Sequence, residues 1–166
     1  FGISESVKDV ETLQFKEILK YDLSVLYDSK FDEDAYEDYR REIDGKNLEY
    51  TKTYEELFTV DYDEIDQVVN VIVPEDRKEF KNYVALRDKD RGEELELSKR
   101  GVIITEKLSK LKKLKVGDPL ELRDVYGNEF EVEVAGITEF YIGHNVYMDK
   151  DLSLIHISEP TRRYAI

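Results

Sequence analysis

The stretch "FEVEVAGI" at positions 130–137 limits most strongly how this chain can fold. Apolar residues alternate with glutamates along it, and the apolar members are Phe130, Val132 and Val134. This period of two predicts a strand with one face in a core and the other in water. "PLELRD" predicts a partner strand that begins at Pro119, and the turn "VYGNE" joins the two strands into a hairpin.

The residues on either side of the hairpin predict further strands and a helix. "GVIIT" at 101–105 is typical of a buried strand, and Thr105 is expected to cap a helix that packs through Leu108 and Leu111. "HNVYM" at 144–148 predicts another strand. Because no regular strand–helix–strand rhythm is present, we expect an α+β fold with a mixed sheet and a few short helices.

The first hundred residues contain two predicted helices. Residues 3–19 have apolar positions at helical spacing, which predicts an amphipathic helix. Residues 31–45 predict a second helix, with Asp32 as its N-cap and Gly45 at its end. The expected apolar face of this second helix consists of Tyr36, Tyr39 and Ile43.

Strands are predicted in the same part of the chain. Residues 20–28 alternate between apolar and polar side chains, and residues 48–62 and 66–74 are also strand-like, the last ending at Pro74. Residues 77–86, "RKEFKNYVAL", fit either a short helix or a strand.

Composition excludes several classes of function. The net charge is −14, whereas phosphate recognition needs clustered lysine and arginine, so we expect no nucleic-acid partner. The chain has no cysteine and therefore no disulfide, thiol nucleophile or thiolate metal site. It also lacks a phosphate-binding glycine loop, a nucleophile elbow and a His-Glu-x-x-His motif.

The polar loop predicted at residues 87–94 bears a partial likeness to a calcium-binding loop. Asp88 and Asp90 occupy the first and third positions of such a loop. Gly92 comes one position early, and Lys99 stands where a bidentate glutamate is needed. The residues therefore favour a solvated turn over a calcium site.

Other clusters of ionisable residues are better explained as exposed surface. Carboxylates crowd residues 32–38 and 61–66 in alternation with core-type positions, whereas acid–base catalysis needs a pocket. Five lysines lie in the segment from Lys107 to Lys115. They form either the solvent-exposed face of an amphipathic helix or a patch that binds anions.

The histidines give no catalytic or metal-binding constellation. His144 has no second histidine near it once His156 is set aside, and one histidine makes neither a metal site nor a catalytic triad. We therefore expect no catalytic residue, no bound metal and no cofactor.

The end of the chain differs from the rest. "LSLIHISEPTR" at 152–162 resembles, residue for residue, a conceptual translation of the adaptor used in transposase-based DNA sequencing libraries. We interpret 151–166 as a non-native, adaptor-derived tail. On this interpretation one edge or face of the sheet with "HNVYM" stays uncovered, and removing 152–166 should cost little stability.

Residues 101–150 contain, in order, a strand, the helix start "ITEKL", the turn "LKVGD", the strand "LELRD", a turn with glycine and the strand "VEVAGI". In this order the segment resembles the large extracytoplasmic domain of ABC-transporter permeases of the FtsX/MacB type. The opening "FGISESV" is similar to the point where such permeases leave their first membrane helix. The pattern departs at Lys112 and Lys113, where the family shows an apolar residue and a glycine.

The resemblance implies an incomplete MacB-like periplasmic core. Residues 1–20 would be a stalk helix after a missing membrane span, and 21–150 a partial extracytoplasmic α+β domain. The implied role is mechanical and not enzymatic. A separate cytoplasmic ABC ATPase hydrolyses ATP, and a permease dimer at the cell membrane moves a lipoprotein, peptide or lipid, or regulates a cell-wall enzyme.

A free-standing soluble extracellular binding module is the alternative, and a carboxylate-based enzyme is a more distant one. The DNA upstream distinguishes them, because an apolar span of about 20 residues before Phe1 favours the permease. A signal sequence or an immediate start codon favours the module.

Overall fold

The predicted hairpin is present and forms one wall of a closed barrel. The computed structural model describes residues 20, 26–28, 33–46, 48–140, 143–156 and 163–165. Within them β5 (Pro119–Arg123) pairs antiparallel with β6 (Glu129–Thr138). Val132 and Val134 are buried in the barrel, whereas the glutamates between and before them face water, as the alternation predicts.

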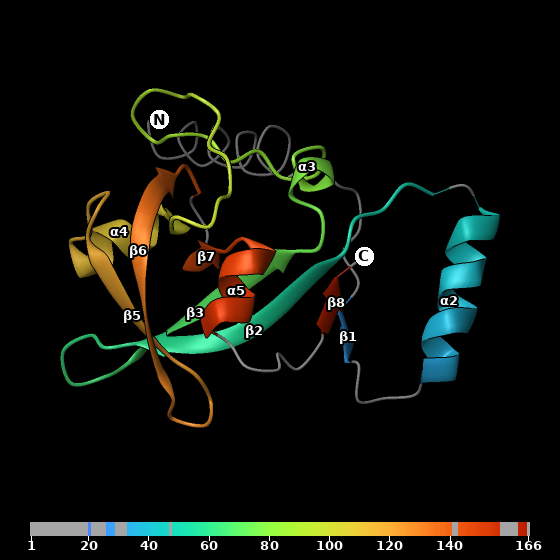
Figure 1. Ribbon diagram of the computed structural model, residues 1–166, viewed down its shortest axis with the longest axis horizontal. Helices are drawn as coiled ribbons and strands as arrows, with labels where there is room; N and C mark the ends of the chain where they lie inside the picture. The colour runs from blue at the N-terminus through green and yellow to red at the C-terminus, as the bar shows by residue number, and fades with distance from the viewer. Residues whose placement is uncertain are drawn as a thin grey trace, which may run out of the picture.

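Four more strands complete the barrel (Figure 1): β2 (Thr53–Val60), β3 (Gln67–Pro74), β4 (Val102–Thr105) and β7 (Asn145–Tyr147). The order around the barrel is β2-β3-β7-β4-β6-β5, and Thr59 of β2 pairs with Arg123 of β5 to close it. The β3–β7 and β4–β6 pairs are parallel, and the others are antiparallel. The prediction of an α+β fold with a mixed sheet is confirmed.

Two short strands lie beside the barrel. β8 (Arg163–Ala165) pairs antiparallel with β1 (Leu26–Asp28) and, through Ala165, with Thr53 of β2. The strand predicted over residues 20–28 is thus present in part, with residues 21–25 outside the described residues.

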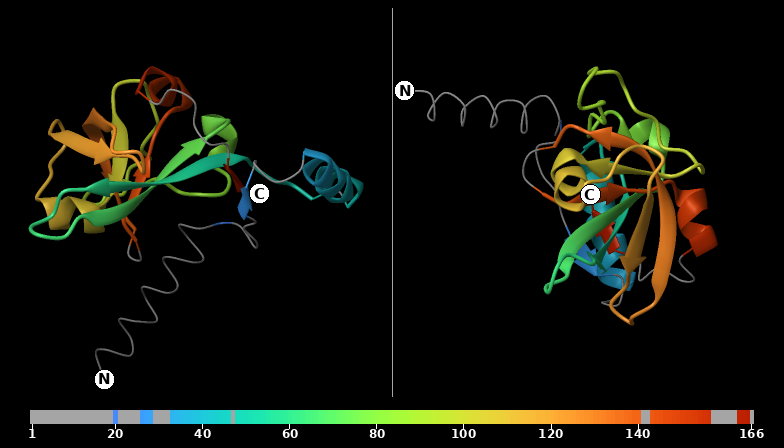
Figure 2. Two further views of the ribbon diagram at one scale, coloured as in Figure 1. Left: turned by 90° about the horizontal axis from the view of Figure 1, so that it is seen from below. Right: turned by 90° about the vertical axis from the view of Figure 1, so that its left-hand side faces the viewer.

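The described helices are α2 (Glu33–Gly45), α3 (Arg77–Phe80), α4 (Glu106–Lys112) and α5 (Lys150–His156). Figure 2 shows α2 apart from the barrel, whereas α4 packs on β4 and β6 and α5 lies across β3. The helix predicted at 31–45 is confirmed, and Ile43 on it is buried. Asp32 and the side chains of Tyr36 and Tyr39 lie outside the described residues, as does the helix predicted at 3–19.

The apolar side chains form two clusters, one inside the barrel and one on its outer wall. The inner cluster includes Leu108 of α4 with Val132 and Val134, and Leu111 packs against its edge, as predicted. The outer cluster covers the side of β3, β4 and β7 that faces away from the barrel interior: Ile72, Phe80, Val84, Leu86, Leu97, Ile103 and Tyr147. The first four of residues 77–86 form the helix α3, and the remaining six are not helical.

One edge or face of the sheet that contains "HNVYM" is expected to stay uncovered, and at this strand itself no edge is open. β7 lies between two neighbours, because Val146 pairs with Val71 of β3 on one side and with Ile104 of β4 on the other. Val146 is fully buried. The local sequence could not show this, because strand order depends on pairings between distant segments.

The cap predicted at Thr105 is only partly correct. Thr105 occupies the N-cap position of α4, but its side chain makes no capping hydrogen bond. The hydroxyl donates to the carbonyl of Gly143 at 3.0 Å and accepts from the backbone N–H of Asn145 at 3.2 Å. Thr105 therefore ties the start of α4 to the segment that leads into β7.

Part of the segment 152–166 has partners in the fold, because Leu152 and Ser153 are buried and Arg163–Ala165 form β8. Leu152 belongs to the barrel cluster and is 6% exposed, and Ser153 is 5% exposed. Asp149 begins this helix by accepting the N–H of Asp151 at 2.9 Å. Among the residues that the structure describes, no helix combines the length and the apolar character of a membrane span.

Candidate functional site

The loop compared with a calcium site is a closed turn. The carboxylate of Asp88 accepts the backbone N–H groups of Asp90 at 2.9 Å and of Arg91 at 2.8 Å. The hydrogen bond from Arg91 is the main reason why the pKa of Asp88 lies below its usual value. Lys99 is not part of this turn and faces Asp151 at 3.7 Å. The described residues contain no group of three or more side chains that could hold a metal ion.

Four of the crowded carboxylates lie on the surface and pair with cations. Asp61 and Asp66 each lie 3.0 Å from the guanidinium of Arg123, at the point where β2 meets β5. On α2, Glu37 and Asp38 form exposed ion pairs with the arginines three residues further on. These contacts join two hairpins and support a helix, and they leave the carboxylates in water.

The lysines and histidines are not brought together into one site. Lys110 pairs with Glu106 at 2.7 Å, and the ammonium group of Lys112 donates to the carbonyl of Asp61. Burial, followed by the charge of Lys107, lowers the pKa of His144, so its imidazole is neutral at pH 7. Nδ1 of His144 is buried without a hydrogen-bond partner in the described chain. The side chain of His156 lies outside the described residues.

A cavity of about 260 Å³ lies between α3 and the segment that follows it. Four of its lining residues are cationic and one is acidic, which is unusual for a chain with a net charge of −14. The polar lining residues are Lys20, Arg77, Lys81, Arg87 and Glu94, and the apolar ones are Phe80, Val84, Ala85, Leu86, Leu95 and Leu97.

Apart from Ala85, the apolar lining belongs to the outer cluster on the barrel wall or packs against it. Phe80 is 3% exposed and its ring centroid lies 6.1 Å from that of Tyr147 on β7. Val84, Leu86 and Leu97 are also buried in this cluster. Because these side chains are held against three strands of the barrel, the base of the cavity has a fixed shape.

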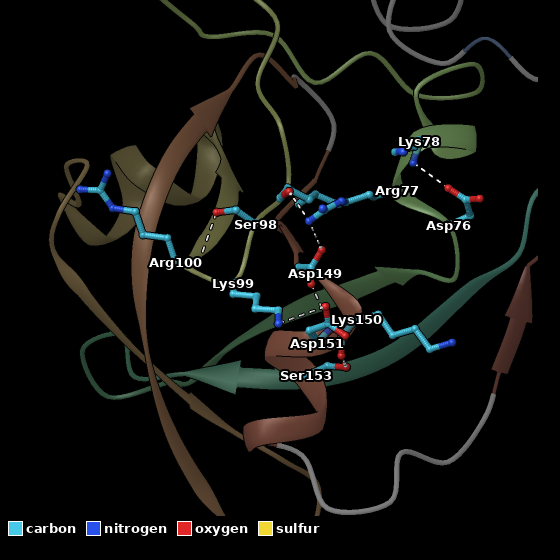
Figure 3. Close-up of polar contacts among 11 residues, drawn as sticks. Asp76, Arg77, Lys78, Ser98, Lys99, Arg100, Asp149, Lys150, Asp151 and Ser153 are labelled. Carbon is cyan, nitrogen blue, oxygen red and sulfur yellow. Dashed lines mark hydrogen bonds and ion pairs between the residues drawn. The ribbon is translucent and has the colours of Figure 1, made fainter.

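Arg77 is positioned by a buried carboxylate (Figure 3). Its Nη1 donates to Oδ2 of Asp149 at 3.1 Å and to the carbonyl of Leu97 at 3.2 Å. Asp149 is 4% exposed, whereas the side chain of Arg77 is 50% exposed. One guanidinium therefore joins α3, the segment before β4 and the start of α5.

Two of the other three cations of the cavity, Lys81 and Arg87, are paired within the chain, whereas Lys20 is exposed. Lys81 contacts Glu96 at 2.7 Å and Glu94 at 3.1 Å, and these hydrogen bonds raise the pKa of Lys81. Arg87 contacts Glu139 at 3.1 Å. A guanidinium has five N–H donors, and the donors of Arg77 other than those on Nη1 have no partner among the described residues. Arg77, whose guanidinium is held in place, is therefore better positioned than the exposed Lys20 to bind an anion.

A second, wider hollow of about 850 Å³ lies on the other side of α3. Tyr50 and Tyr83 line it together with four carboxylates and Lys52. Burial, followed by the charges of Glu79 and Glu49, raises the pKa of Tyr83. One of the carboxylates, Asp76, is the N-cap of α3, so it has a structural role.

The sequence interpretation missed Arg77 and the cavity. The signal was present in "RKEFKNYVAL", where cations and apolar residues alternate at helical spacing, but it could not show which strands the apolar side would cover. Asp149 lies more than seventy residues away along the chain, and only the fold brings it to Arg77. No protein-family model matches this chain, and no curated protein matches it either.

Proposed function

We propose that this chain is the extracytoplasmic part of an ABC-transporter permease of the FtsX/MacB type, built around a MacB-like core. In this role it does no catalysis. It transmits the motion driven by a cytoplasmic ATPase to a lipoprotein, peptide or lipid, or to a cell-wall enzyme. The permease acts as a dimer in the cell membrane, with these residues on the outer side.

The observation that carries the proposal is the backbone conformation at Lys113. Lys113 has φ 54° and ψ 43°, the left-handed conformation that follows many helices and that glycine adopts at least cost. The resembled family has glycine at this position. The backbone here therefore has the form that the family pattern requires, although this chain carries a lysine.

The order of elements in residues 101–150 gives further support. The expected strand, helix, turn, strand, glycine turn and strand correspond to β4, α4, the turn at Gly117, β5, the turn at Gly127 and β6. Both glycines have positive φ angles, 96° and 84°. The segment that carries the resemblance is thus one continuous side of the barrel.

The test is purification of the full-length gene product from membranes. We expect an ABC ATPase to copurify with it and to hydrolyse ATP after reconstitution in lipid. A variant that lacks residues 21–150 should retain the ATPase and lose the effect on the extracytoplasmic partner. Recovery of a secreted protein without an ATPase would contradict the proposal and favour the free-standing binding module.

A further inference from the structure

The cavity beside α3 combines two chemical features that few protein surfaces place together. Its rim has a positioned guanidinium with spare N–H donors, and its base is a fixed apolar surface. Both hydrogen bonds from Arg77 to Asp149 and Leu97 come from Nη1. The N–H groups on Nε and Nη2 therefore stay available to a ligand.

We propose that this cavity binds a small amphiphile, or the end of a longer one, with a single carboxylate head group and an apolar tail. The carboxylate receives a bidentate pair of hydrogen bonds from Arg77, and the tail lies on Phe80, Val84 and Leu86. A carboxylate amphiphile would then be the class of ligand that this domain binds. This proposal rests on the proposed function only in one respect, which is where the ligand comes from in the cell.

The geometry of Arg77 favours a planar anion. The two hydrogen bonds from Nη1 hold one side of the guanidinium against the protein. The free side of the fork fits the two oxygens of a carboxylate, and such charge-assisted pairs are stronger than neutral hydrogen bonds. Side-chain entropy is already lost, because Asp149 fixes Arg77 before any ligand arrives.

The charges around the cavity select against other head groups. A cationic head would meet Arg77, Lys81 and Arg87 together, and it would find only Glu94 as a partner in the lining. A second negative charge on the head would find Lys81 and Arg87 already paired with glutamates. A singly charged carboxylate satisfies both conditions.

The volume limits the length of the tail. About 260 Å³ is about the liquid volume of nine water molecules, which is below the usual range for drug-sized ligands. The base is lined by the buried side chains Val84, Leu86 and Leu97. Transfer of an alkyl chain from water to this apolar surface favours binding. A short acid therefore fills the cavity, and a longer one projects from it.

Calorimetric titration of the whole 166-residue chain with octanoate is the primary test. We expect saturable binding with one site, at least about tenfold tighter than octanol, because octanol lacks the charge-assisted pair. Octyltrimethylammonium should not compete. Equal affinity for octanoate and octanol, or no saturable binding of octanoate, would overturn the proposal.

Variants assign the binding to this cavity. Arg77→Gln combined with Asp149→Asn removes the guanidinium without leaving a buried carboxylate unpaired, and it should weaken octanoate binding about tenfold or more relative to Asp149→Asn alone. Ala85→Leu should also weaken binding by filling the cavity. Lys78→Gln removes a neighbouring exposed cation outside the cavity and should change affinity less than about twofold. Equal effects of the Arg77 and Lys78 changes would contradict the assignment.

Two further ligands distinguish the sources of such a carboxylate. N-acetyl-Leu-Leu with a free C-terminus represents a peptide end, and its amidated form removes only the charge. Preference for this dipeptide over octanoate indicates a peptide end, and the reverse indicates a fatty acid. Both results support the carboxylate site, and equal binding of the free and amidated peptide counts against it. These measurements need no membrane or ATPase. A negative binding result would therefore leave the proposed function standing, and loss of the proposed function would leave a positive binding result standing.

Discussion

The guanidinium of Arg77 lies 3.1 Å from the carboxylate of Asp149, which joins α3 to the start of α5 across the outer wall of the barrel. Asp149 is almost fully buried, and Arg77 is half exposed. Because the carboxylate of Asp149 is shielded from water, loss of Arg77 would leave a buried charge unpaired, and this costs more than breaking an exposed ion pair.

Removal of Arg77 alone should therefore destabilise the fold. We expect Arg77→Met to lower the free energy of unfolding by about 1–3 kcal/mol, since it leaves Asp149 without its cation. Adding Asp149→Asn should recover part of this loss. Urea denaturation of the two single variants and the double variant gives the coupling energy, and strictly additive losses would show that the pair is not coupled.

Replacement of Lys113 by glycine should stabilise the protein. A non-glycine residue in the left-handed region costs on the order of 1 kcal/mol, and Lys113→Gly removes this cost. The comparison change Lys112→Gly, one residue earlier in α4, should cost about 1 kcal/mol of helix propensity and also loses the hydrogen bond to the carbonyl of Asp61. Thermal melting of both variants tests the assignment, and a lower melting temperature for Lys113→Gly would contradict it.

Leu152 and Leu154 allow a direct test of whether the end of the chain belongs to the core. Leu152 is 6% exposed in the barrel cluster, and Leu154 is 63% exposed on the same helix. We expect Leu152→Ala to cost about 2–3 kcal/mol and Leu154→Ala less than about 0.5 kcal/mol. Equal and small effects in chemical denaturation would restore the interpretation that 152–166 lies outside the fold.

Much of the secondary structure could be predicted because its signals are local. The alternation in β6 and the helical spacing around Leu108 depend on neighbours in sequence, and both predictions are confirmed. Barrel closure could not be predicted, since it depends on the pairing of Thr59 with Arg123. The candidate site was missed for the same reason, because Asp149 reaches Arg77 only through the packing of α5 on the barrel.

Acid should destabilise the protein partly through Asp88. The hydrogen bond from the N–H of Arg91 lowers the folded-state pKa of Asp88 below 3.8. The stability that it contributes is therefore present above the unfolded-state pKa, near 4, and is lost as the pH falls through the lower folded value. An asparagine side chain at this position would still accept the same N–H groups but would not titrate, so Asp88→Asn should flatten the loss of stability as the pH falls below about 4. Identical acid profiles for the two proteins would exclude this role.

The location of the barrel relative to the membrane tests the central claim most directly. The chain has no cysteine, and Tyr126 is 74% exposed in the turn between β5 and β6, so Tyr126→Cys adds an accessible thiol. The full-length gene product with this change is expressed in intact cells and treated with a membrane-impermeant maleimide, and the unchanged protein serves as the control. We predict that the introduced thiol is labelled in intact cells. Labelling only after the cells are broken would place the barrel in the cytoplasm and contradict its assignment as the extracytoplasmic part of a permease.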